Sequence, residues 1–237
     1  MFKFLKQILA SESKPVRRKS GTLHAQPLRH GVELLEERAL LNCDCTLNNE
    51  GVLTIEGTNV KDIVFLVVDT KGTADGSDDQ VKLDVTHSGH THTLRFMLSD
   101  VFNIIFRGND GNDEFNNITS IPSEAWGGGG EDTLWGGGGN DTLHGGDGND
   151  RLLGDNGHDA LYGDGGTDTL LGGRGNDRLD GGNDQHVDQM TGGTGIDTFV
   201  QHEWSSGFPF YWRSHTNDDI TDFNANEDVK VWHCHGC

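Results

Sequence analysis

Aspartate recurs at a fixed interval through the second half of this chain, where its carboxylates could hold metal ions. Six consecutive nine-residue units begin from Gly127 to Gly172 without a slip, and each carries an Asp at its sixth position. Three less regular units begin at Gly108, Gly181 and Gly192. The sixth-position residues are Asp113, Asp132, Asp141, Asp150, Asp159, Asp168, Asp177, Asp188 and Asp197. A row of carboxylates attracts cations and, without them, repels itself.

Glycine occupies the first, second and fourth positions of most units. Because glycine lacks a Cβ, it allows backbone turns that other residues resist, and such a turn directs carbonyl oxygens toward the aspartate. We expect second- and fourth-position glycines to supply metal-ligating carbonyls, namely Gly128, Gly130, Gly137, Gly139, Gly146, Gly148, Gly157, Gly166, Gly173 and Gly175.

The ligands on offer are all oxygen atoms, which decides the ion. Flexible oxygen sites with six to eight ligands suit Ca²⁺, whereas Mg²⁺ demands tighter octahedral geometry and gives up water reluctantly. Zn²⁺ in structural sites prefers His or Cys, and the sixth position offers neither. The spacing therefore predicts Ca²⁺.

The elements that must position these loops follow from the eighth position, which is Leu, Met or Phe in every unit. Residues seven to nine should be extended, with the eighth side chain buried. Two units then form one coil turn of 18 residues, and the sequence predicts an all-β, two-sheet parallel β-roll over residues 107–200. Loops two units apart should stack, bringing together Asp132 with Asp150, Asp150 with Asp168, Asp141 with Asp159, and Asp159 with Asp177.

One apolar residue in nine is little with which to fold a chain. Ordering the backbone costs roughly 1–2 kcal/mol per residue, so the bound metal should supply the difference and couple ion uptake to folding. Only 32% of the 237 residues are hydrophobic, and the formal net charge is −20. Such an acidic chain repels nucleic acid. No apolar run approaches the length of a membrane-spanning helix.

The periodic block resembles the hemolysin-type calcium-binding repeats, also called repeats-in-toxin (RTX) nonapeptides, whose pattern is G-G-x-G-x-D-x-U-x with U apolar. The resemblance covers about 90 residues. It implies a parallel β-roll and Ca²⁺-dependent folding outside the cell. "DDITDFNANED" (218–228) is similar to a segment that often follows the last repeat of such proteins, and in the family the C-terminal region often assists secretion.

The flanking regions read differently. Residues 46–106 contain five apolar or alternating runs separated by Gly, Asn and Asp, which predict a β-rich N-terminal region. Residues 1–45 form a basic N-terminal segment in which "LEERALL" (35–41) resembles a short motif of bacterial surface proteins and implies export. An ordinary amphipathic helix is the alternative there.

Residues 201–237 carry five aromatic side chains between 204 and 212, and we expect them to cap the end of the roll.

Two irregularities interrupt the repeats. "NITSIPSEAW" replaces a full unit after Asn116, and the unit at Gly181 is two residues longer and places His186 where the fourth-position Gly belongs. We expect that longer loop to bulge and to give the weakest site of the consecutive series.

Other chemistries find less support. "HEWSS" at His202 lacks the second His of a zinc protease, no G-x-S-x-G is present, and the Gly runs lack G-K-[ST]. His87, His90 and His92 could hold Zn²⁺ or Cu²⁺, or could lie on an exposed polar strand. Cys43, Cys45, Cys234 and Cys237 could bind a soft metal, pair as disulfides or have no role.

The sequence therefore predicts a non-enzymatic Ca²⁺-binding repeat protein, secreted or at the cell surface. The alternatives are an adhesion or surface-matrix component that binds a glycan or a cell surface and, less favoured, a small secreted enzyme. We expect calcium ions as partners, with no nucleic acid and no membrane span.

Overall fold

The computed structural model describes residues 44–70, 76, 78–204, 219–224 and 228–235. Its elements are β-strands apart from one short 3-10 helix, Leu98–Asp100. Most of the basic N-terminal segment, including "LEERALL", lies outside the described residues, as does the aromatic run at 208–212. Within the described part, no helix is long and apolar enough to cross a membrane.

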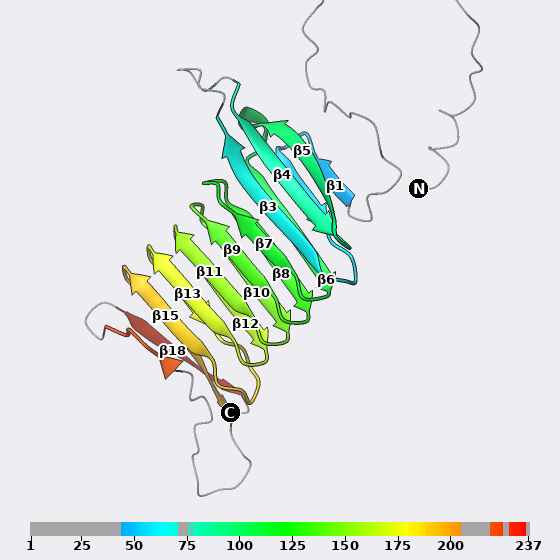
Figure 1. The fold of residues 1–237 in the computed structure, drawn as a ribbon. Coiled ribbons are helices and arrows are strands. Elements are labelled where there is room, and N and C mark those ends of the chain that lie inside the picture. Colours follow the sequence, from blue (N-terminus) through cyan, green and yellow to red (C-terminus); the bar gives the residue numbers. More distant parts are fainter. Residues whose placement is uncertain (1–43, 71–75, 77, 205–218, 225–227, 236–237) are drawn as a thin grey trace, which may run out of the picture. The chain divides into compact units, whose positions relative to one another are not determined.

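The strands form two nine-stranded sheets that face each other (Figure 1). One sheet has the order β1-β2-β6-β8-β10-β12-β14-β16-β18, and the other has the order β17-β15-β13-β11-β9-β7-β3-β4-β5. The bounds in the first sheet are β1 Asp44–Leu47, β2 Val52–Glu56, β6 Asn103–Asp110, β8 Ser123–Gly129, β10 Thr142–Asp147, β12 Ala160–Gly165, β14 Arg178–Asp180, β16 Thr198–Trp204 and β18 Val229–His235. Those in the second are β3 Asp62–Asp69, β4 Gln80–His87, β5 His90–Met97, β7 Glu114–Asn117, β9 Thr133–Gly137, β11 Arg151–Asn156, β13 Thr169–Arg174, β15 Gln189–Thr194 and β17 Asp219–Ile220.

From β6 to β18 successive strands alternate between the two sheets, which is the parallel β-roll that the nine-residue period predicts. Leu152 in β11 lies in register between Leu134 in β9 and Leu170 in β13, each 18 residues away. The coil turn of two units is therefore confirmed. Gly is frequent in the loops because it tolerates the positive φ that the turns require, and the short runs between the loops are extended.

The core of the roll lies between the two sheets. Every eighth-position residue from Leu134 to Phe199 is fully buried between the sheets: Leu134, Leu143, Leu152, Leu161, Leu170, Leu179, Met190 and Phe199. Phe115 in β7 continues this line and stacks on Phe106 of β6, with ring centroids 5.1 Å apart. The strict apolar eighth position thus forms a continuous seam.

The roll begins earlier in the chain than its glycine repeats. β2 pairs with β6 in parallel and β3 pairs with β7 in parallel, so the region predicted to be β-rich supplies a first coil turn. Between β3 and β6 the chain inserts β4 and β5, which extend the second sheet by antiparallel pairing. β1 adds an antiparallel strand to the edge of the first sheet.

The far end of the roll is extended by strands that lack the glycine repeat. β18 pairs in parallel with β16, and β17 pairs in parallel with β15. Phe223 packs on the core, and its ring makes an edge contact with Phe199. The described residues of the C-terminal segment therefore cover the last coil.

Candidate calcium-binding loops

The sixth-position aspartates form two columns, one along each side of the roll where the chain passes between sheets. In each column the backbone N–H of one Asp donates to Oδ1 of the Asp in the next coil, over distances of 2.6 to 2.9 Å. One column runs through Asp113, Asp132, Asp150, Asp168 and Asp188, and the other through Asp141, Asp159, Asp177 and Asp197. The predicted pairing of loops two units apart is confirmed.

The second carboxylate oxygen of these aspartates is left over. Oδ2 is buried and has no hydrogen-bond partner in seven of them: Asp113, Asp132, Asp141, Asp150, Asp159, Asp168 and Asp177. All seven residues are at most 3% exposed. A buried carboxylate oxygen without a partner is costly, so each of these atoms marks a place suited to a cation.

In most of these loops a backbone carbonyl of the next coil lines the same space as the Oδ2 atom. A Cβ placed on Gly145 would fall within contact of Asp150 Oδ2 and 2.8 Å from the carbonyl oxygen of Gly163 in the next coil. A Cβ on Gly148 would overlap the carbonyl oxygen of Gly130, and one on Gly146 would overlap that of Gly128. The first-, second- and fourth-position glycines thus keep the space between stacked loops open to carbonyl oxygens.

Burial acts strongly on the carboxylates. Together with the charges of Asp188 and Asp150 in the same column, it raises the pKa of Asp168 to about 8. Burial likewise raises the pKa of Asp113, Asp150 and Asp159 to about 7 and that of Asp177 to about 6. Backbone hydrogen bonds from the neighbouring coil oppose the shift without cancelling it. These carboxylates resist ionisation until a cation offsets their charge.

The donor set fits Ca²⁺. Most gaps offer a carboxylate oxygen and carbonyl oxygens of the stacked loops, which are the hard ligands that this ion takes. Across the residues that the structure describes, no three His, Cys, Asp or Glu side chains gather into a metal-binding group. The ligands would therefore be Asp Oδ2 with glycine carbonyls, and the bound ion would supply positive charge and cross-link adjacent coils.

The predicted glycines sit in these loops as expected. Nine of the ten have φ between +97° and +149°, where residues with a Cβ are strained: Gly128, Gly130, Gly137, Gly146, Gly148, Gly157, Gly166, Gly173 and Gly175. Asp155 and Asp164 take the second position of their units with φ of 76° and 68°. Which carbonyls coordinate an ion stays a prediction.

A second side-chain ladder, at the fifth position, was not anticipated from the sequence. Asn140 Oδ1 accepts the N–H of His158, whose Nδ1 accepts the N–H of Asn176, whose Oδ1 accepts the N–H of Ile196. Asn112 and Asn149 do the same in the other column. The frequent "G-N-D" triplet was the available signal for this ladder.

The loop at Gly181 keeps its place despite its extra residues. Asp188 still accepts the N–H of Asp168 at 2.8 Å, as its counterparts do. In the regular loops a fourth-position N–H donates to a backbone carbonyl of the next coil, as from Gly148 to Gly165. Here Gly166 N–H donates instead to the Asp184 carboxylate at 2.6 Å. A side chain thus replaces a backbone acceptor.

Two aspartates outside the repeats continue the columns and were missed by sequence reasoning. Asp62 N–H donates to Asp113 Oδ1 at 2.7 Å, and Asp197 N–H donates to Asp228 Oδ1 at 3.0 Å. Asp62 is the sixth residue of "GTNVKD", which keeps only the first glycine of the pattern. That glycine, with Val64 at the eighth position, was the available signal.

The alternative metal sites gain no support in the described part of the chain. His87, His90 and His92 do not gather into a metal-binding group there. His87 Nδ1 instead lies 3.1 Å from Asp62 Oδ1. Cys45 lies in β1 and packs against the core, while Cys43 and Cys237 and the side chain of Cys234 lie outside the described set.

Comparison with protein families agrees with this geometry. A model of the RTX calcium-binding nonapeptide repeat, four copies long, matches residues 126–161 and again residues 162–199. Residues 126–199 are RTX calcium-binding nonapeptide repeats. Comparison with curated proteins and with solved structures gave no significant match.

The RTX repeats account for only part of the roll. The matched residues begin at β8, whereas the parallel coils begin at β2 and the Asp columns extend from Asp62 to Asp228. The chain is thus a calcium-binding repeat protein whose RTX block is continued at both ends by coils with weaker sequence signals.

Proposed function

We propose that Ca²⁺ uptake drives folding of the roll, and that the chain acts outside the cell as a non-enzymatic calcium-binding protein. One observation carries the proposal: seven buried Oδ2 atoms without partners recur in two columns, each facing a gap between stacked loops. Burying several carboxylates close together is unfavourable unless a cation binds them.

The extracellular location rests on the same chemistry. Extracellular calcium modules work at roughly 10⁻⁴–10⁻³ M ion, so a roll whose folding needs calcium would fold where that ion is plentiful. The resemblance of "LEERALL" to a motif of exported surface proteins points the same way. Detection of the full chain in the medium or on the cell surface, against a cytoplasmic marker protein, tests this part.

A calcium titration followed by circular dichroism tests the coupling. Chelator should abolish the β signal of the repeat block, Ca²⁺ should restore it, and Mg²⁺ should not. Asp150→Asn should weaken the response, whereas Asp147→Asn, at an exposed carboxylate of the same loop, should leave it unchanged. A repeat block that stays folded in excess chelator would overturn the proposal.

Adhesion is a second candidate, favoured by an uncharged row on the outer face of the second sheet. Phe65, Asn116, Trp135, Leu153 and Leu171 lie in register across five strands, and Phe65 and Trp135 are each 36% exposed. An exposed indole is a suitable platform for a sugar ring. Trp135→Ala should reduce binding to glycan-coated surfaces. Trp126→Ala is the control, because His144 stacks on the Trp126 ring and Arg107 lies over it.

A further inference from the structure

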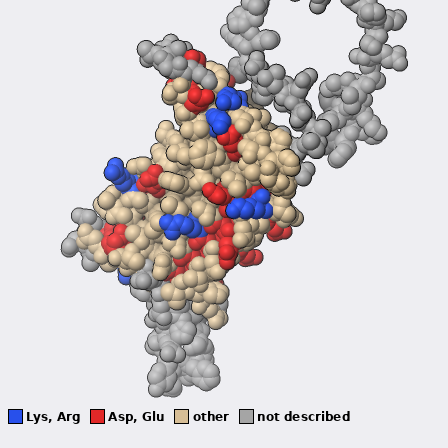
Figure 2. Space-filling model, in the orientation of Figure 1, with Lys and Arg blue, Asp and Glu red and all other residues tan. Residues whose placement is uncertain are grey.

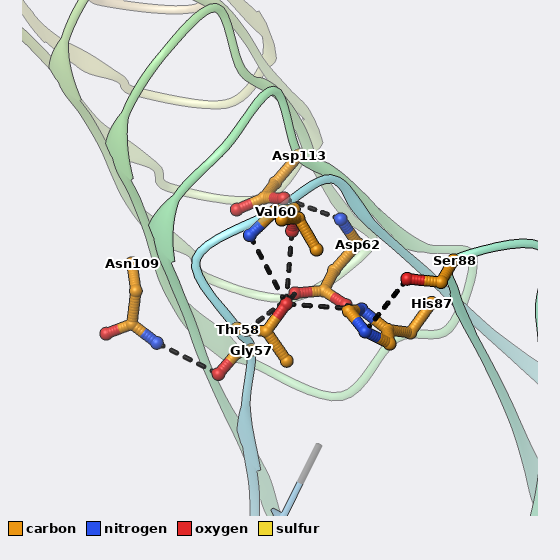
Figure 3. Close-up of polar contacts among 8 residues, drawn as sticks. All are labelled: Gly57, Thr58, Val60, Asp62, His87, Ser88, Asn109 and Asp113. Atoms are coloured by element: carbon orange, nitrogen blue, oxygen red, sulfur yellow. Dashed lines mark hydrogen bonds and ion pairs between the residues drawn. The ribbon is translucent and has the colours of Figure 1, made fainter. Parts of the chain in front are cut away.

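The loop between β2 and β3 has the register of a calcium loop. Gly57 stands at its first position, Asp62 at its sixth and the buried Val64 at its eighth. Asp62 is fully buried, and its N–H donates to Asp113 Oδ1 as in the rest of that column (Figure 3). A Cβ on Gly57 would lie 2.7 Å from the carbonyl oxygen of Gly108, which matches the contact seen between later coils.

The carboxylate of Asp62 differs from the others because protein groups already satisfy it. Thr58 donates its N–H to Asp62 Oδ2 at 2.6 Å and its hydroxyl to the same oxygen at 3.0 Å. His87 Nδ1 lies 3.1 Å from Asp62 Oδ1, and Ser88 Oγ lies 3.1 Å from His87 Nε2 (Figure 3). Asp62 Oδ2, unlike the seven Oδ2 atoms of the repeats, is therefore not left for an ion.

The carbonyl side of this gap is altered as well. The second and fourth positions hold Thr58 and Val60 in place of glycines. A Cβ on Gly111 would lie 3.0 Å from the carbonyl oxygen of Val60, whereas at Gly130, Gly148 and Gly175 the equivalent contact is a direct overlap. Asn109 also bridges the two loops by donating its side-chain amide to the carbonyl of Gly57 at 3.0 Å. The residues of this gap do not fit a calcium ion.

We infer that the gap between the loops at Gly57 and Gly108 takes no calcium, and that strands β2 to β6 form a calcium-independent coil on which the RTX repeats are assembled. The inference rests on the proposed calcium-coupled folding of the repeats and adds where that coupling stops.

The coil is suited to this role by its contacts with the first repeat. Asp62 N–H fixes Oδ1 of Asp113 and leaves Oδ2 of Asp113 facing the next gap, where the first ion would bind. Phe106 of this coil stacks on Phe115 of the repeat coil. The pre-folded strands also present their edges to β7 and β8, which pair with β3 and β6.

Hydrogen exchange of the full chain in excess chelator and in excess Ca²⁺ tests the first half of the inference. In chelator, we expect amides of β2, β3, β4 and β6 to stay protected while those of β10 to β13 exchange freely. Calcium should then protect both groups. Exchange of β2 and β3 as fast as that of β10 and β11 in chelator would overturn the inference. Repeats that stay protected in chelator would instead overturn the proposed calcium coupling.

A gain-of-site variant tests the second half. Thr58→Gly/Val60→Gly restores the full G-G-x-G-x-D-x-U pattern around Asp62, so titration calorimetry should count one more Ca²⁺ per chain than in the wild type. Protection of β2 and β3 should then depend on calcium. The same variant carrying Asp62→Asn lacks the carboxylate and should gain no ion. An unchanged ion count in Thr58→Gly/Val60→Gly, with the coil folded in calcium, would overturn the inference.

Discussion

The first coil and the RTX coils share one geometry and differ in what holds them together. Strands β2, β3 and β6 each bury two large apolar side chains: Leu53 and Ile55, Val64 and Leu66, and Ile104 and Phe106. The strands β9 to β14 each bury one. The loops differ as well. Thr58 and His87 contact the Asp62 carboxylate, whereas seven of the repeat aspartates keep a buried oxygen without a hydrogen-bond partner. If the proposed function holds, the comparison teaches that one coil geometry is stabilised by apolar burial in the first coil and by cations in the repeats.

The acidic residues of the chain lie in two settings, at the surface and buried in the columns. The chain carries a formal charge of −20, and Figure 2 shows Asp and Glu side chains across the visible face with Lys or Arg beside several of them. The column aspartates are almost fully buried, so they cannot rely on solvent or on surface lysines. Their charge has to be met within the roll, which the first coil does with hydrogen bonds.

Truncating a core leucine in each region should give the largest difference in stability between the first coil and the RTX coils. Leu152→Ala should destabilise the calcium-loaded protein by about 2–5 kcal/mol, as for other buried leucines, and should have no effect on chelated protein if the repeats are then unfolded. Leu66→Ala, the matched change in the first coil, should destabilise both forms. Denaturant unfolding with and without Ca²⁺ measures this. Equal effects of Leu152→Ala in the two conditions would contradict the division.

Glycine substitutions should separate the stacked loops from an ordinary turn. Gly148 has φ +138°, and a Cβ there would overlap the Gly130 carbonyl, so Gly148→Ala should cost about 1–3 kcal/mol and weaken calcium binding. Gly89 has φ +80° in the β4–β5 turn and nothing within 4 Å of a Cβ, so Gly89→Ala should cost only the backbone strain. Thermal unfolding in Ca²⁺ compares them, and equal costs would mean that stacking does not constrain Gly148.

Acidification should weaken calcium binding by the RTX coils. Because burial raises the pKa of Asp168 to about 8 and that of Asp150 to about 7, binding an ion requires loss of a proton near neutral pH. Calcium affinity per site should fall by up to about tenfold per pH unit below these values.

The stability of the calcium-free roll should depend on pH in the opposite direction. A raised carboxylate pKa makes the folded roll less stable as pH rises from about 4 through 8. Calorimetric titrations of Ca²⁺ into the protein at pH 8, 7 and 6 should show the calcium affinity falling as the pH is lowered. An affinity independent of pH across that range would rule out these carboxylates as ligands.

The smallest effect concerns the loop at Gly181. Its fourth position carries no glycine, and Asp184 replaces a backbone acceptor for Gly166 N–H. The site between the loops at Gly163 and Gly181 should therefore be the weakest of the consecutive series. At limiting Ca²⁺, amides of residues 181–190 should exchange before those of residues 145–150. Equal protection would show that the Asp184 contact replaces the missing glycine fully.

The sequence by itself determined the repeat coils. A nine-residue period with Asp at the sixth position and one apolar residue at the eighth leaves a single arrangement in which the apolar side chains share a core. Leu134, Leu152 and Leu170 lie in the predicted register for that reason. The sequence also predicts loops that offer only oxygen ligands, because glycine at each turn allows backbone carbonyls to face the space between the loops.

Only the tertiary structure decided where the columns end and what ends them. His87 lies 25 residues along the chain from Asp62 and reaches it because β4 pairs with β3. No local pattern encodes that meeting, which depends on strand pairing across an insertion. The partnerless Oδ2 atoms likewise belong to carboxylates held by the neighbouring coil, because the hydrogen bond to each Oδ1 comes from a residue 18 or 19 positions away, or 51 positions away for Asp113.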